Sequence, residues 1–181
     1  GRRLRAMKHV ILLLAVVLVG GVTNDAVVVV DFDQLEGESY RVFKGKPFTG
    51  IAVSKWPNGQ KKEERPYKKG DRHGLFTKWH PNGQKSKEFK MSYGYSVGRS
   101  TYWYDNGQKK WEGNWKDGKH HGLVTGWYSN GQKNWEGNWK DGKKVGLQTG
   151  WYENGQKKKE VTYKAGKKIS EKWWDKDGNP R

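Results

Sequence analysis

Hydrophobic and polar positions alternate with a period of two along most of the chain beyond residue 40. In residues 133–140, Trp135, Gly137 and Trp139 fall on one side of an extended strand and polar residues fall on the other. Residues 123–128 form a second such run. Because successive side chains of a strand point to opposite faces, both runs predict half-buried β-strands.

The two runs belong to a unit of 24 residues that recurs along the chain. Asn-Gly-Gln-Lys starts at residues 58, 82, 106, 130 and 154, and other glycines keep the same phase. Asn-Gly favours a type I′ hairpin turn, and Asp-Gly, which ends the second run, offers the same chemistry. We therefore predict an all-β fold, an elongated single-layer antiparallel meander of tandem hairpins. The glycines of the Asn-Gly turns expected to build the repeats are Gly59, Gly83, Gly107, Gly131 and Gly155, and positive φ is predicted for Gly107, Gly131 and Gly155.

Aromatic side chains must supply most of the burial, since Leu, Ile and Val are scarce after residue 55. We predict ladders of rings along the sheet with ring pairs between strands. Gly113 and Gly137 sit between two tryptophans on one face and would leave room for a ring from the next strand. The tryptophans expected to build the repeats are Trp103, Trp111, Trp115, Trp127, Trp135, Trp139 and Trp151.

The N-terminal part of the chain has a different pattern. Four basic residues precede an unbroken apolar run, Val10–Val22, which has the length of a signal-peptide core and is short for a membrane span. We predict a signal peptide or N-terminal anchor over residues 1–21, with cleavage near Gly21 favoured. A lead-in strand and linker over 22–39 and the repeat array over 40–181 follow. Export to the periplasm, envelope or medium is expected if the leader is used, and a cytoplasmic location otherwise.

The net charge limits the kinds of partner, and the cysteine content limits the kinds of site that the chain can form. The net charge is +17, and +13 would remain without residues 1–21. This favours acidic partners, or it reflects a lysine-rich surface that keeps a thin sheet soluble. The chain has no cysteine, which excludes disulfides and thiolate metal sites.

No arrangement of residues predicts catalysis. The glutamates at 64, 88, 112, 136 and 160 recur once per repeat in equivalent surroundings, whereas a catalytic pair needs two different environments. They are expected to face lysines on neighbouring strands. The adjacent His120 and His121 are a poor metal site. We therefore predict a non-enzymatic protein with no cofactor, no metal and no small-molecule substrate.

Residues 111–122 (WEGNWKDGKHHG) resemble the MORN repeat, and residues 135–146 repeat the motif. The added Trp-Tyr-x-Asn-Gly-Gln-Lys segment resembles the bacterial MORN-variant repeat of the YwqK-type antitoxin component family. The resemblance covers about residues 40–181. It implies a MORN-like hairpin array and an antitoxin role.

Two functions remain open after these observations. The first is a scaffold that binds a protein partner, including the antitoxin or immunity type. The second is an envelope-associated binder of anionic lipid or polysaccharide, which would explain the leader and the charge. Nucleic acid is a less favoured partner, because an exported protein rarely meets it.

One repeat departs from its own pattern between Phe89 and Arg99. Tyr93 and Tyr95 flank Gly94 where neighbouring turns carry Lys or Asp, and Arg99 replaces a repeated leucine. Tyr and Arg are enriched where proteins bind partners. We consider Tyr93, Tyr95 and Arg99 candidate partner contacts; the alternative is neutral drift with local repacking.

Overall fold

The computed structural model describes residues 27–181, so the predicted leader and its cleavage point lie outside the described part. The first elements are β1 (Val29–Asp31), the 3₁₀ helix η1 (Phe32–Gln34), β2 (Val42–Phe43), β3 (Lys46–Pro47), β4 (Gly50–Lys55), β5 (Lys61–Lys68), β6 (Asp71–Arg72) and β7 (Gly74–Trp79). The regular array continues with β8 (Lys85–Ser92), β9 (Tyr95–Trp103), β10 (Lys109–Lys116), β11 (Lys119–Trp127), β12 (Lys133–Lys140), β13 (Lys143–Trp151), β14 (Lys157–Lys164) and β15 (Lys167–Trp173).

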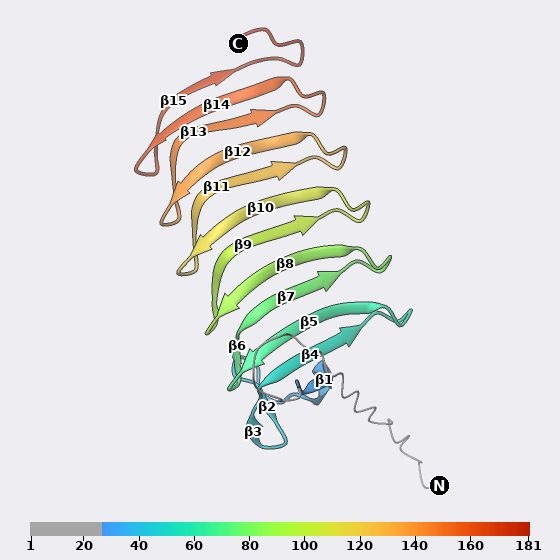
Figure 1. The fold of residues 1–181 in the computed structure, drawn as a ribbon. Coiled ribbons are helices and arrows are strands. Elements are labelled where there is room, and N and C mark those ends of the chain that lie inside the picture. Colours follow the sequence, from blue (N-terminus) through green and yellow to red (C-terminus); the bar gives the residue numbers. More distant parts are fainter. Residues whose placement is uncertain (1–26) are drawn as a thin grey trace, which may run out of the picture.

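All of these strands except β2 and β3 form one elongated sheet, as predicted, and β2 and β3 pair in a separate two-stranded sheet (Figure 1). From β4 onward the long strands pair antiparallel with their neighbours in sequence, and the short β6 pairs with β5. The N-terminal edge differs from the prediction of a wholly antiparallel sheet, because β1 pairs with β4 in parallel. The strand expected over residues 123–128 is also longer than predicted, since β11 begins at Lys119.

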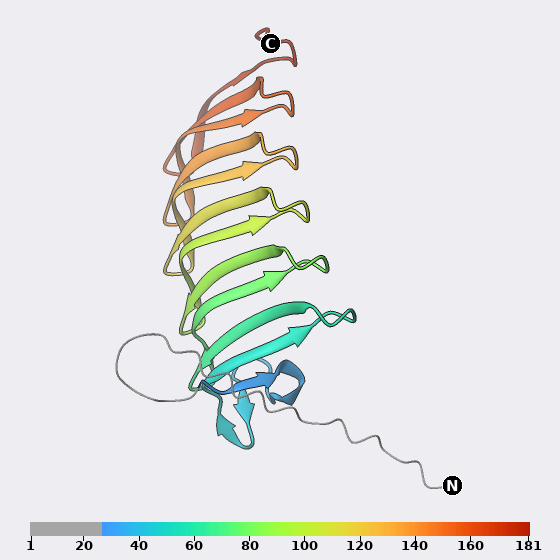
Figure 2. The ribbon, with the colours of Figure 1, turned by 45° about the vertical axis from the view of Figure 1, so that its right-hand side comes forward.

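The long strands bend shortly after they begin, which curves one side of the sheet (Figures 1 and 2). The bend in β11 falls at Gly122, whose φ is +86°, and Gly98 and Gly146 take similar values in β9 and β13. Three residues of β11 separate His120 from Val124, whereas one residue of β10 separates their partners Trp115 and Gly113. The extra residues therefore lie on β11. Extra residues on one strand of a pair bend it, and glycine adopts the positive φ that the bend requires.

The turns on the bent side follow the type I′ geometry. Asp117 and Gly118 connect β10 to β11, with φ of 50° and 72°, and Lys116 pairs directly with Lys119. Asp141 and Gly142 repeat this arrangement one unit later. Both central residues therefore have the positive φ that defines the turn.

The Asn-Gly turns on the other side have a different geometry, so their predicted type was wrong. Gly107, Gly131 and Gly155 have the predicted positive φ, and with Gly59 and Gly83 their values lie between 82° and 86°. Asn130, however, does not have a positive φ, which a type I′ turn would require. Gly131 N–H donates to the Tyr128 carbonyl and Tyr128 N–H to the Gln132 carbonyl. These bonds close a three-residue loop that ends in a left-handed glycine bulge.

The Asn-Gly-Gln sequence also connects each repeat to the next. The Asn130 side chain accepts a hydrogen bond from Gln132 N–H and donates one, 3.0 Å long, to the Glu153 carbonyl of the following turn. The Gln108 side-chain oxygen fills the space beside Gly131 in the following turn, 2.6 Å from where a Cβ would lie. The recurring motif is thus explained by contacts between repeats as well as by the turn.

A second line of hydrogen bonds runs beside the first. The Tyr104 hydroxyl donates to the Trp127 carbonyl and the Tyr128 hydroxyl to the Trp151 carbonyl, both over 2.8 Å. The equivalent side chains of Trp56, His80 and Tyr152 make the same contact to the next repeat. Each hairpin is therefore tied to its successor by side chains in addition to strand pairing.

The sheet has two different faces. We call one the core face, because it carries most of the buried apolar side chains, among them Phe76, Met91, Val124 and Val161. At its N-terminal end, β1, η1 and the β2–β3 hairpin contribute to the cluster of Val30, Leu35, Phe48, Ala52 and Tyr67. Rings pair across strands on this face, as predicted: Phe76 stacks on Phe89 at 5.2 Å and Tyr102 lies 5.0 Å from Trp111.

Glycines on the core face make room for large side chains, in part differently from the prediction. A Cβ on Gly126 would lie 2.4 Å from the Trp135 indole nitrogen, so Trp135 occupies that space. Gly113 is covered by Trp111 of its own strand and by Val124. The room beside Gly137 is filled by the Gln148 amide, and not by a ring as expected.

Replacing Asn130 should separate the two roles of the Asn-Gly-Gln turn. We expect Asn130→Ala to lose about 1 kcal/mol or more of unfolding free energy, since it removes both hydrogen bonds. Asn130→Asp keeps the acceptor for Gln132 but not the donor to Glu153, and should lose a smaller amount. Urea unfolding followed by tryptophan fluorescence measures both, and an unchanged midpoint for both variants would contradict the assigned role.

Candidate binding surface

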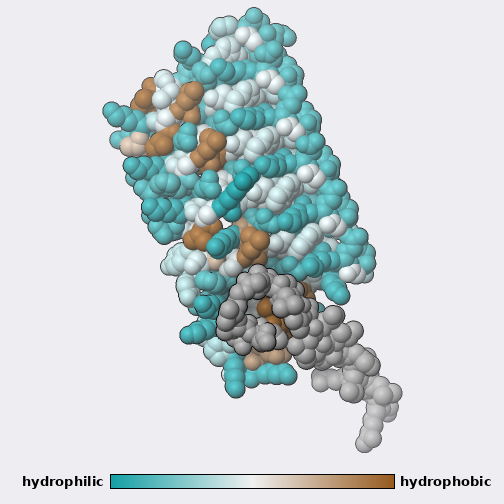
Figure 3. Space-filling view, in the orientation of Figure 1, coloured by the Kyte–Doolittle hydropathy of each residue, from teal (hydrophilic) through white to brown (hydrophobic). Residues whose placement is uncertain are grey.

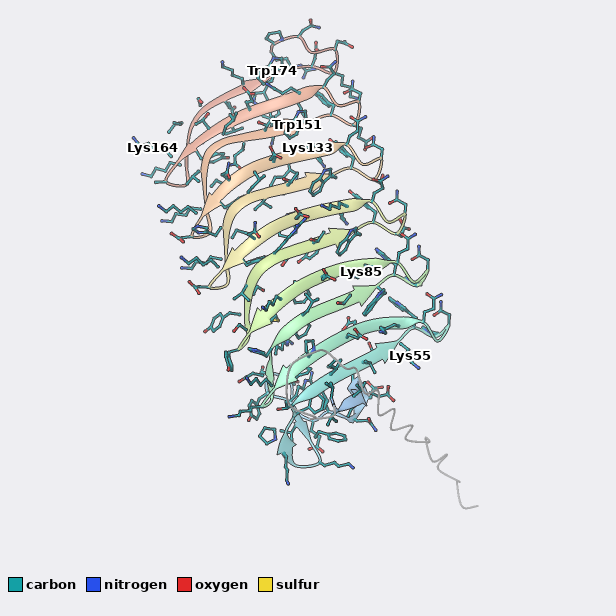
Figure 4. The ribbon with its side chains drawn as sticks, viewed as in Figure 1. Lys55, Lys85, Lys133, Trp151, Lys164 and Trp174 are labelled. Atoms are coloured by element: carbon teal, nitrogen blue, oxygen red, sulfur yellow. The ribbon has the colours of Figure 1, made fainter. Side chains whose placement is uncertain are left out.

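The second face of the sheet carries repeated lysine and tryptophan side chains, and we call it the tryptophan–lysine face. Its lysines are Lys61, Lys85, Lys109, Lys133 and Lys157, and its tryptophans are Trp79, Trp103, Trp127 and Trp151. The Lys133 ammonium lies 5.6 Å from the Trp151 ring centre, and Lys109 lies equally far from Trp127. Figure 4 shows Lys133 and Trp151 on adjacent strands β12 and β13. A cation over an indole ring gains about 0.5–1 kcal/mol at an exposed site.

The repeated glutamates lie on this face, but their lysine partners differ from the prediction. Each glutamate pairs with the lysine three residues earlier on its own strand, as Lys133 does with Glu136 at 2.6 Å. Across the strands Glu136 faces Thr125 and Thr149, and the Thr125 hydroxyl donates to it over 3.3 Å. The bulge between Gly126 and Trp127 places Trp127 opposite Lys133, the first residue of β12. From there Lys133 reaches back to Glu136 on the same strand.

Glu112 has the richest contacts of these carboxylates. Arg99 and Lys109 both bind it, Lys109 at 2.9 Å. Burial raises the pKa of the Glu112 carboxyl, but the hydrogen bonds and positive charges of Arg99 and Lys109 outweigh it and hold that pKa below its usual value. Glu112 is therefore ionised near neutral pH and acts as a fixed anchor for the Arg99 guanidinium.

A line of leucines is exposed on the tryptophan–lysine face, near the bend. Leu75, Leu123 and Leu147 occupy the same position in their repeats and are 53%, 46% and 49% exposed. In the space-filling view, brown hydrophobic side chains gather toward the bent side of this face, and white and teal rows cover the opposite side (Figure 3). Arg99 takes the leucine position in the repeat between Leu75 and Leu123.

The three contact residues proposed from the sequence lie at two separate places in the structure. Tyr93 is the first central residue of a type I′ turn and Tyr95 follows that turn, and they are 57% and 65% exposed. Tyr93 lies against the His73 ring, with centres 4.8 Å apart. Arg99 lies further along β9, beyond the bend at Gly98, on the tryptophan–lysine face. All three side chains face solvent, and Arg99 alone is held by a charged partner.

On the core face, His120 lies between two indole rings. Its ring centre is 3.8 Å from Trp115 and 5.4 Å from Trp139. Burial lowers the pKa of His120 below 6.5, because the charged imidazolium loses water there. His121 points elsewhere, toward Asp141 at 3.3 Å. The adjacent histidines thus enter different surroundings, as their alternation in a strand requires.

Within residues 27–181, no group of three or more His, Asp or Glu side chains is arranged to hold a metal ion. In the same part of the chain, no helix has the length and apolar character needed to cross a membrane. The side chains that recur on the surface are those suited to contact: indoles, lysines and exposed leucines.

Comparison with known families supports the repeat type. A family model described as "MORN repeat variant" matches residues 48–69, 72–90 and 144–165. The chain is thus similar to a repeat that generally serves as a binding module. No curated protein matches the chain. The matched model supports the MORN-like array and does not extend to the antitoxin family that the sequence also resembles.

The buried position of His120 predicts a pH dependence of stability. The unfolded chain, with a histidine pKa near 6.5, binds the proton more tightly than the folded chain does. The stabilising contribution is therefore complete above pH 6.5 and is lost as the pH falls from there toward the lower folded pKa. We expect His120→Gln to lose less unfolding free energy than the parent between pH 7.5 and pH 5. Equal losses in both proteins would contradict the assignment.

Proposed function

We propose that the protein is a non-enzymatic repeat scaffold that binds a protein partner through its tryptophan–lysine face. The observation that carries the proposal is the exposed line of Leu75, Leu123 and Leu147 beside the tryptophan rows. Apolar side chains that share a face and remain about half exposed mark sites of protein contact when polar residues surround them. Neighbouring tryptophans and arginine are the residue types that dominate binding energy in such interfaces.

The spacing of the exposed leucines predicts how apolar side chains are spaced on the partner. Equivalent residues of adjacent repeats are two strands apart, about 10 Å, because strands pair at about 4.8 Å. A partner that follows the line would place apolar side chains at roughly this interval. The lysine rows beside the line favour a partner with acidic residues next to its apolar ones. Arg99 interrupts the line and would fix the position of the partner along it.

Tyr93 and Tyr95 extend the proposed contact to the edge of the array. Among the turns of the bent side, this one has aromatic residues where others have lysine, aspartate or, at residue 165, alanine. If the protein is of the antitoxin or immunity type, its partner is a toxin and the array covers part of the toxin surface. If the chain is exported as predicted, its partner is a protein of the cell envelope or of the exterior.

A different observation favours the second function, binding of anionic lipid or polysaccharide. Lys116 pairs directly with Lys119, Lys140 with Lys143 and Lys164 with Lys167 at successive turns. Like charges opposite each other in a sheet are destabilising. None of the six has a carboxylate within 4.0 Å in residues 27–181. An acidic polymer or membrane at this edge would relieve the repulsion.

Capture of the partner from the native host distinguishes the two functions. We expect the wild-type chain to retain a protein partner and the variant Leu75→Ser/Leu123→Ser/Leu147→Ser to lose it, with little change in stability because the leucines are half exposed. As a matched control, Lys116→Gln/Lys140→Gln/Lys164→Gln should retain it. Loss of capture in the lysine variant alone, with sedimentation on anionic vesicles in the wild type, would favour the second function and contradict the first.

The tyrosine contact has its own test. Tyr93→Lys/Tyr95→Asp introduces the residues that Lys69 and Asp71 provide one repeat earlier, where Lys69 already adopts a φ of 50°. The array should therefore fold with an unchanged unfolding midpoint. Partner affinity should fall about tenfold or more if the tyrosines are contact residues. Undiminished affinity would instead support neutral drift in this repeat.

A further inference from the structure

The last repeat departs from the two before it on the core face, although Lys87 already occupies the same position in an earlier repeat. Lys159 occupies the position that holds Trp111 and Trp135 in the two preceding repeats. Gln148 occupies the position of Phe76, Ser100 and Val124. Lys159 and Gln148 thus place two long polar side chains on the adjacent strands β13 and β14. The sequence shows both replacements when the repeats are aligned in columns.

These replacements open a cleft on the core face. Without a tryptophan at 159, the lysine methylenes lie over Gly150, at 3.1 Å from where a Cβ would be. A cleft of about 180 Å³ remains, and its lining includes Trp135, Trp139 and Tyr163. Sites for drug-sized ligands occupy roughly 300–1,000 Å³. The cleft therefore accepts a single ring, with any longer molecule extending outside.

Two lysines reach the cleft, and neither is neutralised. The Lys144 ammonium lies 5.6 Å from the Trp139 ring centre and 5.3 Å from that of Tyr163. The Lys159 ammonium lies 5.4 Å from Trp173. Neither has a carboxylate within 4.0 Å among residues 27–181. Trp173 lies outside the cleft lining, so the Lys144 ammonium lies on the aromatic walls and the Lys159 ammonium at the rim. Two unpaired positive charges there favour an anion and disfavour a cation.

The Trp139 indole supplies a third feature. Its Nε1 atom is buried and has no hydrogen-bond partner in the described structure. A buried donor without an acceptor costs about 1–3 kcal/mol, so most are satisfied. By contrast, the Trp56 indole donates to the Trp79 carbonyl at 3.1 Å. An acceptor that enters the cleft and displaces the side chains covering this atom would satisfy the Trp139 N–H.

We propose that this cleft binds one acidic sugar residue, such as a uronic acid unit of a polysaccharide. The apolar C–H face of a pyranose ring packs on indole and phenol rings. The ring carboxylate pairs with Lys144 and Lys159, and a hydroxyl accepts from Trp139 Nε1. A neutral aromatic ligand would leave both charges unused, and an inorganic anion would leave the walls unused. The site lies on the face opposite the proposed protein contact and does not depend on it.

The probe is a short oligogalacturonate, compared with its methyl ester, which keeps the rings but removes the charge. We expect the full chain to bind the acid, seen by calorimetry and by a change in tryptophan fluorescence, and to bind the ester about tenfold more weakly or worse. Lys159→Trp introduces the ring of the two preceding repeats and fills the cleft. It should fold normally and abolish binding.

Two further variants keep the result interpretable. Lys159→Met retains most of the side-chain stem and should weaken binding of the acid toward the affinity of the ester, even if Lys159→Trp perturbs folding. Lys158→Met, whose lysine lies over Tyr152 on the other face, should bind like the wild type. Equal affinity for acid and ester, or binding unaffected by both Lys159 variants, would overturn the proposal. Loss of binding in the Lys158 variant would do the same.

Discussion

The fold depends on one constraint: a single-layer sheet has no second layer to cover it. Side chains must therefore bury one another within and between repeats. On the core face this is achieved by setting tryptophans against glycines, as Trp135 is set over Gly126. A ring that lies flat over a neighbouring backbone removes much of its own surface and that backbone from water. Where Lys159 replaces the tryptophan, Gly150 remains opposite it and the lysine methylenes lie over that glycine.

The same constraint makes the array depend on neighbouring repeats. Hydrogen bonds from Asn130 and Tyr128 end on the next repeat, so one hairpin completes the contacts of another. Stability in such an array is approximately a sum of repeat terms and nearest-neighbour terms. Because neither face is covered by another layer, side chains with no structural task remain accessible over a long surface. The exposed leucines and the cleft at Lys159 are both consequences of this architecture.

The regular part of the fold could be predicted from sequence, since period-two patterning and phased turn residues are local signals. The strand over residues 133–140 and the positive φ of Gly131 followed directly from them. The conformation of Asn130 could not, because its side chain is bound by the following repeat and the favoured loop depends on that contact. The parallel pairing of β1 with β4 is likewise a long-range choice with no local signature.

The candidate sites were predictable to a smaller extent. The unusual composition around Tyr93 and Tyr95 is visible in the sequence, but their exposure and their separation from Arg99 require the bend at Gly98. Lys159 gives no local signal of a cleft, because lysines are frequent throughout the chain. It becomes significant only when Trp139, Lys144 and Tyr163, from three strands, meet around it. Which residues of neighbouring strands meet depends on the strand register, and a single repeat of the sequence does not show it.

The most direct test of the account is removal of one whole repeat, residues 119–142. The deletion joins Gly118 to Lys143, which keeps the turn and the register, and places Lys144 next to Trp115 on the core face. If neighbouring side chains are the only second layer, the shortened chain should remain a folded β-sheet with a lower urea midpoint and a single cooperative transition. A shortened chain that is unfolded, or one as stable as the parent, would contradict it.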